Sequence, residues 1–453
     1  MGSAGMVAAE FASTLGVKVA CAERGRIGGD CLWTGCVPSK ALLASAKAAH
    51  TMRAGVHGVA AVEPAVDTAR VWSRIHAVQD EIARDDDNAD RFRALGVAVL
   101  EGAASLSPAA RVRVGEEEHE TRFVLLATGS RPALPPIEGL AAAAPLTSER
   151  IFTLTRPPRS VVMIGGGPIS VELAQGLARL GVAVTVLQRG PRVLPREEPE
   201  LAERLLARLR AEGTEVVTGV DADRVTVADG RKTVHAGERS WSAEEIFVGA
   251  GRLANVEHLG LEQAGVRVGA RGVVVDRALR SSVRTVYAAG DVAGRHRFTH
   301  AAGYEAARAV RNMFFPGTSK GPYLVPWCTF TDPELAHAGM TEAEARARHG
   351  DRAVRVWRHD LAHSDRARTD SATDGELRIV TARDRIVGAH VLAPSAGEVI
   401  GELALAIDRK LKLRDLANVV HVYPTIALAI QQLAARASYE SARRYAWLVR
   451  SRA

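Results

Sequence analysis

Two stretches of the chain share one order of apolar strand, glycine-rich turn, helix and second apolar strand, and this order constrains the fold more than any other feature. The clearer copy has a strand at Ser160–Ile164, a turn at Gly165 and Gly167, a helix to Leu180 and a strand at Val182–Leu187. Such βαβ units build parallel sheets whose strands are buried on both faces. We therefore expect an α/β fold with Rossmann-like dinucleotide-binding domains.

The turn of this copy is suited to bind a dinucleotide. Gly165 and Gly167 allow the backbone to turn tightly and approach a pyrophosphate, which then lies at the positive end of the following helix. Ser170 replaces the third glycine and is still small enough for close packing of helix on strand. Gln188 and Arg189 stand where an acidic residue would bind the 2′-hydroxyl of NAD, and an arginine can instead bind the 2′-phosphate of NADPH. We therefore expect NADPH, with NADH as the alternative.

The other copy lies at the start of the chain. Gly2–Gly5 opens a helix to about Leu15, and Val17–Glu23 forms the next strand, with Glu23 placed to accept hydrogen bonds from ribose hydroxyls. The first strand of this unit and its first glycine would precede Met1. About five buried apolar residues at ~1.5–3 kcal/mol each amount to the stability of a whole domain. We therefore expect that the chain begins further upstream, or that it folds and binds its dinucleotide poorly.

The rest of the chain completes a three-domain arrangement. Short apolar runs at Phe123–Gly129 and Thr285–Gly290 look like strands that rejoin the first sheet, and proline and glycine at 130–147 and 314–326 are typical of crossings between domains. After about residue 323, apolar strands alternate with two or three helices and no glycine-rich turn. The predicted domains are a first dinucleotide-binding domain (1–147 and 276–322), a second one (148–275) and an α+β domain that forms a dimer interface (323–453).

Composition excludes several other classes of protein. The 453 residues are 47% hydrophobic and 25% charged, which is typical of a globular protein, and 453 residues exceed one ordinary core. The net charge of +7 comes from arginines spread along the chain, so we expect no nucleic-acid partner. No apolar run is long enough to span a bilayer and the start lacks the pattern of a signal peptide, so we expect a cytoplasmic protein.

One closely spaced cysteine pair, Cys31 and Cys36, is the main candidate for chemistry. On an ideal helix, residues five positions apart have Cα atoms about 8–9 Å apart, and this exceeds the ~4.4–6.8 Å that a disulfide tolerates. The pair can therefore bond only if the backbone departs from a regular helix, and Thr34-Gly35 supplies a flexible step. Pro38 fits the first turn of a new helix, which places Cys36 at a helix N-terminus, where the dipole favours the thiolate.

Two structural readings of the cysteines compete with this one. Half of a zinc site would need about four ligands in total, and no second cluster of cysteine and histidine has ligand spacing, so we expect no metal site. A pair of buried free thiols is the other reading. We favour that reading for the two remaining cysteines, Cys21 and Cys328, and a redox role for the close pair.

The segment around the pair resembles the pyridine nucleotide–disulfide oxidoreductases, the family that holds dihydrolipoamide dehydrogenase, glutathione reductase and mercuric reductase. The resemblance rests on Gly28-Gly-Asp-Cys-Leu-Trp-Thr-Gly-Cys-Val-Pro-Ser-Lys40. It continues through Ala127-Thr-Gly129, the second dinucleotide turn, Gly249-Ala-Gly-Arg252, Ala289-Gly-Asp291 and Thr329-Phe-Thr-Asp-Pro-Glu334. The resemblance therefore covers the whole chain.

The resemblance implies an FAD domain, an NAD(P) domain inserted in it, and a C-terminal domain that completes the partner's active site in a homodimer. It implies that electrons pass from the nicotinamide to FAD and then to the disulfide. Cys36 would be the thiolate in contact with the flavin, Cys31 the thiol that attacks the acceptor, and Lys40 a residue near the flavin that pairs with Glu172.

The resemblance also implies two sets of binding residues. For FAD these are Gly2, Ser3, Ala4, Gly5, Glu23, Gly29, Asp30, Lys40, Gly102, Ala127, Thr128, Gly129, Asp291, which would hold the ribityl chain, and Ala301. For NAD(P) they are Gly165, Gly167, Ile169, Glu172, Gln188, Arg189 and Gly251.

One departure from the family concerns the acid and base for thiol exchange. Dihydrolipoamide dehydrogenase and glutathione reductase place a histidine directly before Pro-Thr near the C-terminus, with a glutamate that orients it. Here Tyr423 stands in the place of the histidine and Leu428 in that of the glutamate. A phenol with a pKa of about 10 is a poor base at neutral pH, so we expect slow oxidation of dithiols. Tyrosine at this position is similar to mercuric reductase and to soluble transhydrogenase, and His421 points the other way along an extended segment.

A second departure lies in the C-terminal tail. Mercuric reductase carries a cysteine pair there, whereas Arg443–Ala453 has no cysteine, so we do not expect mercury detoxification. We expect the basic and aromatic tail to be a solvated helix end rather than a membrane contact.

Three functions follow from these patterns. The leading hypothesis is an NADPH-dependent FAD enzyme of mercuric-reductase-like type that reduces a small-molecule acceptor, either a metal ion, a quinone or a small disulfide. The first alternative is dihydrolipoamide dehydrogenase. The second is a dimeric binding module that holds no flavin and catalyses nothing.

Overall fold

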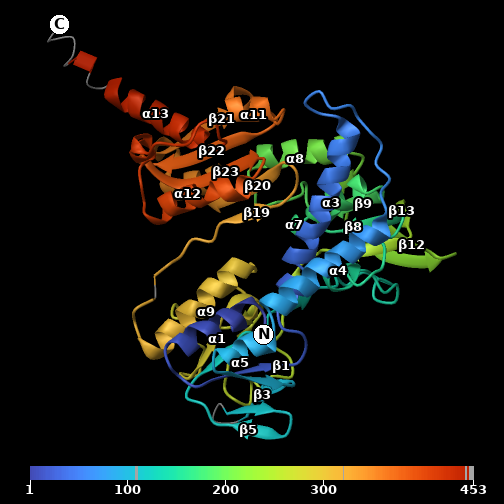
Figure 1. The fold of residues 1–453 in the computed structure, drawn as a ribbon, viewed down its shortest axis with the longest axis vertical. Helices are drawn as coiled ribbons and strands as arrows, with labels where there is room; N and C mark the ends of the chain where they lie inside the picture. The colour runs from blue at the N-terminus through green and yellow to red at the C-terminus, as the bar shows by residue number, and fades with distance from the viewer. Residues whose placement is uncertain (108–110, 320, 444–445, 448–453) are drawn as a thin grey trace.

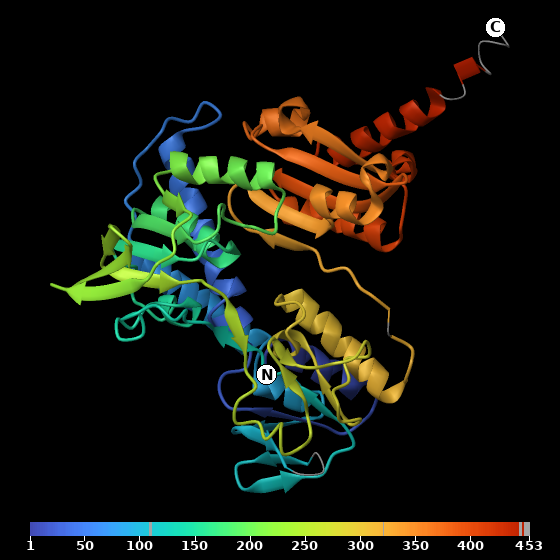
Figure 2. The same ribbon diagram turned by 180° about the vertical axis from the view of Figure 1, so that it is seen from behind.

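The computed structural model describes residues 1–107, 111–319, 321–443 and 446–447, and it places them in three bodies (Figures 1 and 2). Residues 444–445 and 448–453, on which much of the expectation for the C-terminal tail rests, lie outside the described residues. Within the described ranges, every helix is too short or too polar to cross a lipid bilayer.

The first body combines the start of the chain with a later segment and lies at the bottom of Figure 1. Its elements are α1 (Ser3–Thr14), β1 (Val19–Glu23), α2 (Gly29–Trp33), α5 (Ala89–Ala94), β2 (Val97–Glu101), β3 (Ala104–Leu106), β4 (Val112–Val114), β5 (Glu117–His119), β6 (Val124–Leu126), β7 (Ser130–Pro132), β15 (Arg252–Ala254), β16 (Val268–Gly269), β17 (Gly272–Val273), β18 (Val286–Ala288) and α9 (Thr299–Phe314). Small residues let α1 pack closely on α9, with Ala4, Ala8 and Ala12 against Ala302 and Ala306.

The strands of this body form several small sheets. β1 pairs in parallel with β2, and β18 pairs in parallel with β6, with Val286 beside Val124. The expectation that both later strands rejoin the first sheet is therefore wrong: they pair with each other, because no described strand lies between β1 and β6 to hydrogen-bond with both.

The second body holds the clearer βαβ unit. Its elements are α6 (Ser148–Ile151), β8 (Ser160–Ile164), α7 (Pro168–Arg179), β9 (Ala183–Gln188), α8 (Pro199–Ala211), β10 (Glu215–Thr218), β11 (Arg224–Ala228), β12 (Arg231–Ala236), β13 (Arg239–Ala243) and β14 (Glu245–Val248). The strands β10-β9-β8-β14 form a parallel sheet, and β11-β12-β13 an antiparallel one. The apolar run of β8 is buried almost throughout, and nearly all of α7 is buried as well, which confirms the α/β unit.

Two long helices connect the first two bodies. These are α3 (Cys36–Ala54) and α4 (Thr68–Asp85), which run from the first body alongside the second (Figures 1 and 2). Gly176 on α7 lets α3 approach, because a Cβ there would lie 3.3 Å from Cδ2 of Leu42. The start of α3 is thereby held between the two nucleotide-binding units.

The third body is an α+β domain at the top of Figure 1. Its elements are β19 (Trp327–Thr329), β20 (Glu334–Gly339), α10 (Glu342–His349), β21 (Val354–Asp360), α11 (Asp365–Thr369), β22 (Glu376–Ala382), β23 (Arg385–Ala393), α12 (Ala396–Asp408) and α13 (Leu428–Arg443). The strands form one antiparallel sheet in the order β19-β20-β23-β22-β21. The helices α12 and α13 bury Leu403, Ile430 and Leu433 against it. The domain has more helices than the two or three expected, since α10 and the short α11 follow β20 and β21.

Candidate active site

A single long cleft of about 2890 Å³ runs between the first two bodies and is also lined by β19 and the start of α12. Most of the predicted site residues line it. Those that do are Gly2, Ser3, Ala4, Gly5, Glu23, Gly29, Asp30, Cys31, Cys36, Lys40, Gly102, Ala127, Thr128, Gly129, Gly165, Gly167, Ile169, Glu172, Gln188, Arg189, Gly251 and Asp291. Two predicted residues do not: Ala301 is buried inside α9, and Tyr423 lies elsewhere on the third body.

The two cysteines of the pair lie on different helices. α2 ends at Trp33, and α3 begins at Cys36, which confirms that the helix is interrupted and that Cys36 lies at a helix N-terminus. The break requires glycine at position 35, because a Cβ there would lie 2.9 Å from the carbonyl oxygen of Asp30. The backbone between the cysteines therefore departs from a regular helix, which a disulfide between them requires.

Cys31 and Cys36 are not joined by a disulfide in this structure, and their thiols differ strongly in acidity. The pKa of Cys36 is lowered to about 6; the hydrogen bond from Cys31 is the largest cause, and Thr299 and the charge of Lys40 add to it against the opposing effect of burial. The same hydrogen bond, with burial, raises the pKa of Cys31. Sγ of Cys36 lies 3.5 Å from Oγ1 of Thr299. The arrangement therefore holds Cys36 as a thiolate beside a protonated Cys31.

Lys40 is fixed one turn along α3 from Cys36. Its Nζ donates to Oε2 of Glu172 at 2.8 Å and lies 4.2 Å from the centre of the Phe330 ring. Glu172 is buried on α7, and its other oxygen accepts from the backbone N–H of Phe330 at 2.9 Å. The pair therefore joins the helix of the cysteines, the second nucleotide-binding unit and the third body at one point.

The first glycine turn forms a close backbone contact at the start of α1. A Cβ at Gly29 would lie 2.6 Å from Cα of Gly2, so only glycine allows the two segments to meet. No described side chain caps the N-terminus of α1, whose first residues line the cleft. Glu23 ends β1 in the same region. One of its carboxylate oxygens accepts a hydrogen bond from the backbone N–H of Gly25 at 2.8 Å, and the other forms an ion pair with the ammonium group of Met1.

The second glycine turn is equally close-packed. A Cβ at Gly165 would lie 2.7 Å from the carbonyl oxygen of Gly249, and the start of α7 is again without a side-chain cap from any described residue. Ser170 is fully buried, and a Cβ at Gly249 would lie 2.2 Å from its Oγ. The close approach of α7 to the strand end at Gly249 therefore needs a small residue at position 170, as the sequence predicts.

The two residues that end β9 have different places. The carbonyl oxygen of the Gln188 side chain accepts from the backbone N–H of Gly166 at 2.8 Å, so this side chain supports the turn. Arg189 is exposed at the cleft, and none of the described residues forms an ion pair with it. Its guanidinium group is therefore available to an anionic ligand.

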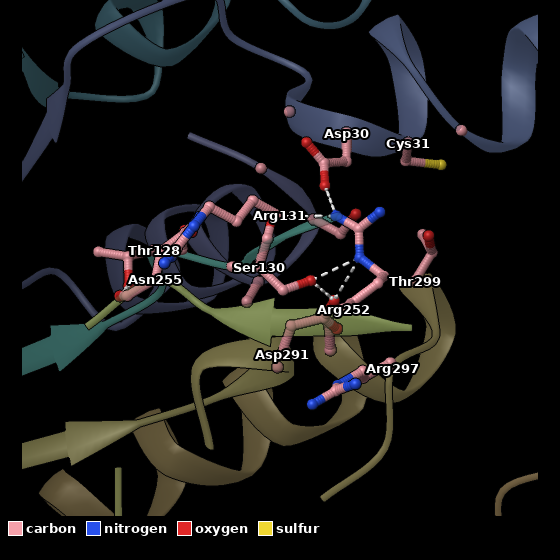
Figure 3. Close-up of a pocket in the computed structure, with 18 of the residues that line it drawn as sticks. Asp30, Cys31, Thr128, Ser130, Arg131, Arg252, Asn255, Asp291, Arg297 and Thr299 are labelled. Carbon is pink, nitrogen blue, oxygen red and sulfur yellow. Dashed lines mark hydrogen bonds and ion pairs between the residues drawn. The ribbon is translucent and has the colours of Figure 1, made fainter. Parts of the chain in front are cut away.

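Sequence reasoning missed the residue at the centre of the first body's polar network, Arg252. Figure 3 shows its guanidinium group between Asp30 on one side and Ser130 and Asp291 on the other. Nε of Arg252 donates to Oγ of Ser130 at 2.6 Å and lies 3.7 Å from Oδ2 of Asp291, and Nη2 pairs with Asp30. Thr299 beside Cys36 was missed as well. Gly249–Arg252 belongs to a recognised motif, so the signal for Arg252 existed, but its partner Asp30 lies far away in the sequence.

Tyr423 and its neighbours form a separate group. Tyr423 is 65% exposed, and its hydroxyl donates to Oδ2 of Asp365 at 3.1 Å, which raises the pKa of the phenol. Nε2 of His421 lies 3.0 Å from Oε2 of Glu402, and its Nδ1 lies 3.1 Å from the carbonyl oxygen of Val419. Both ring nitrogens of this histidine are therefore engaged within the chain.

Comparison with known proteins places these features in a family. Residues 1–306 match the family described as pyridine nucleotide-disulphide oxidoreductase, and residues 325–434 match its dimerisation domain. A mercuric reductase of Acidithiobacillus ferrooxidans is 34% identical over 94% of this chain and 79% of its own length. A dihydrolipoyl dehydrogenase of Bacillus subtilis is 32% identical over 96% of this chain and 95% of its own.

Two solved structures have the same fold as this chain. LpdA from Mycobacterium tuberculosis superimposes with a TM-score of 0.88 at 26% identity, over 96% of this chain and 97% of that one. The HOCl-induced flavoprotein disulfide reductase RclA from Escherichia coli superimposes with a TM-score of 0.85 at 25% identity, over 96% and 98%.

Proposed function

Because the chain belongs to the pyridine nucleotide–disulphide oxidoreductase family, we propose that it passes electrons from NADPH through FAD and the Cys31–Cys36 pair to a small-molecule acceptor. Members of this family are FAD-dependent enzymes that use NAD(P)H as the electron donor. The acceptor that we propose is a metal ion, a quinone or a small disulfide. We do not propose the oxidation of a dithiol such as dihydrolipoamide, because that reaction needs a histidine base.

The residues of the cleft fit two dinucleotides. The uncapped N-termini of α1 and α7 both open onto it and offer backbone N–H groups to a pyrophosphate. The close backbone contacts at Gly29 and Gly165 hold both turns at the wall of the cleft. Glu23 and Asp291 supply carboxylates for hydroxyl groups. We assign the first turn to FAD and the second to the nicotinamide nucleotide.

The chemistry that FAD supplies in this family is the exchange of two electrons between NAD(P)H and a disulfide. The chain itself prepares the acceptor of these electrons. Cys31 donates a hydrogen bond that holds Cys36 as a thiolate, and the ion pair of Lys40 and Glu172 fixes a positive charge nearby. Cys31, which keeps its proton, is the thiol that we assign to the acceptor side.

The coenzyme that we propose is NADPH rather than NADH. Arg189 follows β9 directly, is exposed at the cleft and has no ion-pair partner among the described residues. A free guanidinium group is the side chain best suited to bind a 2′-phosphate. The turn residue before it, Gln188, brings no carboxylate that would repel this phosphate.

The observation that carries the proposed acceptor class is the place of Tyr423. The residue occupies the position of the family's catalytic histidine, and its bond to Asp365 raises the pKa of the phenol, so that still less phenolate is present at neutral pH to accept a proton. His421 does not replace it, because both of its nitrogens are engaged. Among the relatives, a mercuric reductase and a Cu(II) complex of RclA support a metal ion as one acceptor.

We also propose that the active form is a homodimer and that it is cytoplasmic. The match of residues 325–434 to a dimerisation domain supports the first point. So does a short stretch of exposed side chains, with Val420 92% exposed and Val422 76% exposed, beside Tyr423. Tyr423 does not reach the cleft of its own chain, and in a dimer this stretch would bring it to the cleft of the other chain.

A comparison of turnover rates tests the acceptor class. We expect NADPH-dependent reduction of Cu²⁺ or a benzoquinone to exceed NAD⁺-dependent oxidation of dihydrolipoamide by at least about tenfold. A double variant, Tyr423→His with Leu428→Glu, restores a histidine base and should raise dihydrolipoamide turnover, whereas Tyr423→Phe should not. Dihydrolipoamide turnover in the wild type that equals the best NADPH-dependent rate would favour dihydrolipoamide dehydrogenase, the second candidate.

A further inference from the structure

A row of aromatic and basic side chains crosses the sheet of the third body. Trp327 on β19 pairs with His337 on β20, and His337 pairs with His390 on β23. Because directly paired residues point to the same face of a sheet, the two imidazoles lie side by side. Glu197, from the segment just before α8, reaches over them, and one ligand atom from each of these three residues lies within 4.8 Å of the others.

The hydrogen bonds of these residues show which atom of each side chain is left free for a ligand. Nε2 of His337 lies 2.9 Å from the carbonyl oxygen of Gly339, and Nε2 of His390 lies 3.1 Å from that of Met340. Each Nε2 therefore carries the proton, and each Nδ1 presents a lone pair. The indole N–H of Trp327 donates to Oε1 of Glu197 at 2.5 Å, which leaves Oε2 free.

The three inward atoms have no partner. Oε2 of Glu197 and Nδ1 of both histidines make no hydrogen bond with any described residue, although the residues are only 2%, 1% and 0% exposed. Leaving one buried polar atom unpaired costs about 1–3 kcal/mol. Three unpaired atoms on neighbouring buried side chains, each with its other polar atom bonded to a backbone carbonyl or an indole, form the pattern of metal ligands with their supporting shell.

We propose that Glu197, His337 and His390 bind one divalent cation of the zinc class. Two imidazoles and one carboxylate are a ligand set that Zn²⁺ takes up with a fourth position left open. No other group of histidine, cysteine and carboxylate ligands comes together in this way among the described residues. The site is independent of the proposed reaction, since none of its ligands belongs to the cysteine pair or to the two glycine turns.

An ion pair between Glu197 and His337 is the simpler alternative to a bound cation. Nδ1 of His337 lies 3.3 Å from Oε2 of Glu197, so a protonated His337 would satisfy these two atoms. It would leave Nδ1 of His390 buried and unpaired, whereas a cation satisfies all three. The neighbouring Glu198 pairs with Arg378 through Oε2, and its Oε1 lies 3.5 Å from Nε2 of His390, so it contacts the nitrogen of this histidine that is not proposed as a ligand.

The position of the site suggests what the cation does. Glu197 belongs to the second body and both histidines to the third, so a bound ion would join the two bodies directly. Glu197 and Trp327 also line the cleft, and the Trp327 ring stacks on His337 with 3.8 Å between centroids. The cation would therefore hold this wall of the cleft in place.

Zinc binding to the full-length, FAD-loaded protein tests the proposal. The protein is kept oxidised so that Cys31 and Cys36 are not available as thiolates. Equilibrium dialysis against ZnCl₂ should give one tightly bound ion per chain, and X-ray absorption at the zinc edge should show nitrogen and oxygen neighbours at about 2.0–2.1 Å without sulfur. Thermal unfolding should shift upward with zinc.

Variants assign the binding to these residues. Glu197→Gln keeps the acceptor for Trp327 and is the mildest change; together with His390→Asn it should weaken zinc binding at least about tenfold. His359→Asn, on the edge strand β21 of the same sheet, is a matched control that removes a buried histidine outside the cluster. The proposal is overturned if the wild type binds no zinc, if sulfur is found at about 2.3 Å, or if the double variant Glu197→Gln/His390→Asn binds zinc as well as His359→Asn does.

Discussion

Replacing Cys31 with alanine removes the thiol that donates to Cys36, and we expect the pKa of Cys36 to rise from about 6 toward its ordinary value of 9.0. The hydrogen bond from Cys31 is the largest cause of the low value, while Thr299 and Lys40 remain in the variant. At pH 7 a pKa of about 6 corresponds to about 90% thiolate, and a pKa of 9.0 to about 1%. The thiolate fraction should therefore fall severalfold or more, with about ninetyfold as the upper bound.

The assay is the rate at which iodoacetamide alkylates the reduced protein as a function of pH. Cys21 and Cys328 should stay unreactive near neutral pH because burial raises the pKa of both thiols. Cys31→Ser is the matched control, since its hydroxyl group can still donate to Cys36. The reasoning is refuted if Cys31→Ala keeps an alkylation midpoint at about pH 6, because the helix terminus and Lys40 would then set the acidity alone.

Two further predictions concern the nucleotide and the stability of the fold. Arg189→Ala should lower kcat/KM for NADPH about 10–100-fold, because charge-assisted hydrogen bonds are lost, and should leave kcat/KM for NADH nearly unchanged. An equal loss with both nucleotides would contradict a role of Arg189 in binding the 2′-phosphate. Arg179→Met should lower the free energy of unfolding in urea by about 3–5 kcal/mol, because the side chain is 3% exposed and pairs with Glu212 and Asp332, whereas Arg409→Met, at a 71% exposed side chain, should change it little. Burial alone would raise the pKa of Glu212, but the Arg179 hydrogen bond brings this pKa below 4.5. The stabilisation by the ion pair is therefore present above pH 4.5 and is lost as the pH falls. A wild type that loses no more stability in acid than Arg179→Met would contradict the assignment.

Local signals in the sequence were sufficient for the cysteine helix and the second glycine turn. Pro38 and Gly35 lie within a few residues of Cys36, and they determine where α2 ends and α3 begins. The same holds for Gly165, whose turn directly follows a buried strand. In these places the backbone geometry depends on neighbours along the chain, so a pattern of residues predicts it.

Contacts between distant segments could not be predicted in this way. Arg252 pairs with Asp30, and Thr299 contacts Cys36, only because the fold brings β15 and α9 to the start of the chain. The pairing of β6 with β18 is of the same kind, since an apolar run does not specify its neighbour.

The cation cluster was invisible to sequence reasoning for a similar reason. Glu197, His337 and His390 lie on three separate segments without ligand spacing, and only the register of β20 against β23 brings the two histidines together. The sequence therefore led us to expect no metal site.

The most direct test of the central claim is an anaerobic titration of the FAD-loaded protein with NADPH. The account predicts that about one equivalent produces the long-wavelength absorbance of a thiolate in contact with oxidised flavin. This absorbance should disappear in Cys36→Ser and persist in Cys328→Ser, which removes a thiol close to Lys40 and Glu172 that the proposed reaction does not use. Absorbance that is unchanged in Cys36→Ser, or that never forms in the wild type, would contradict the account.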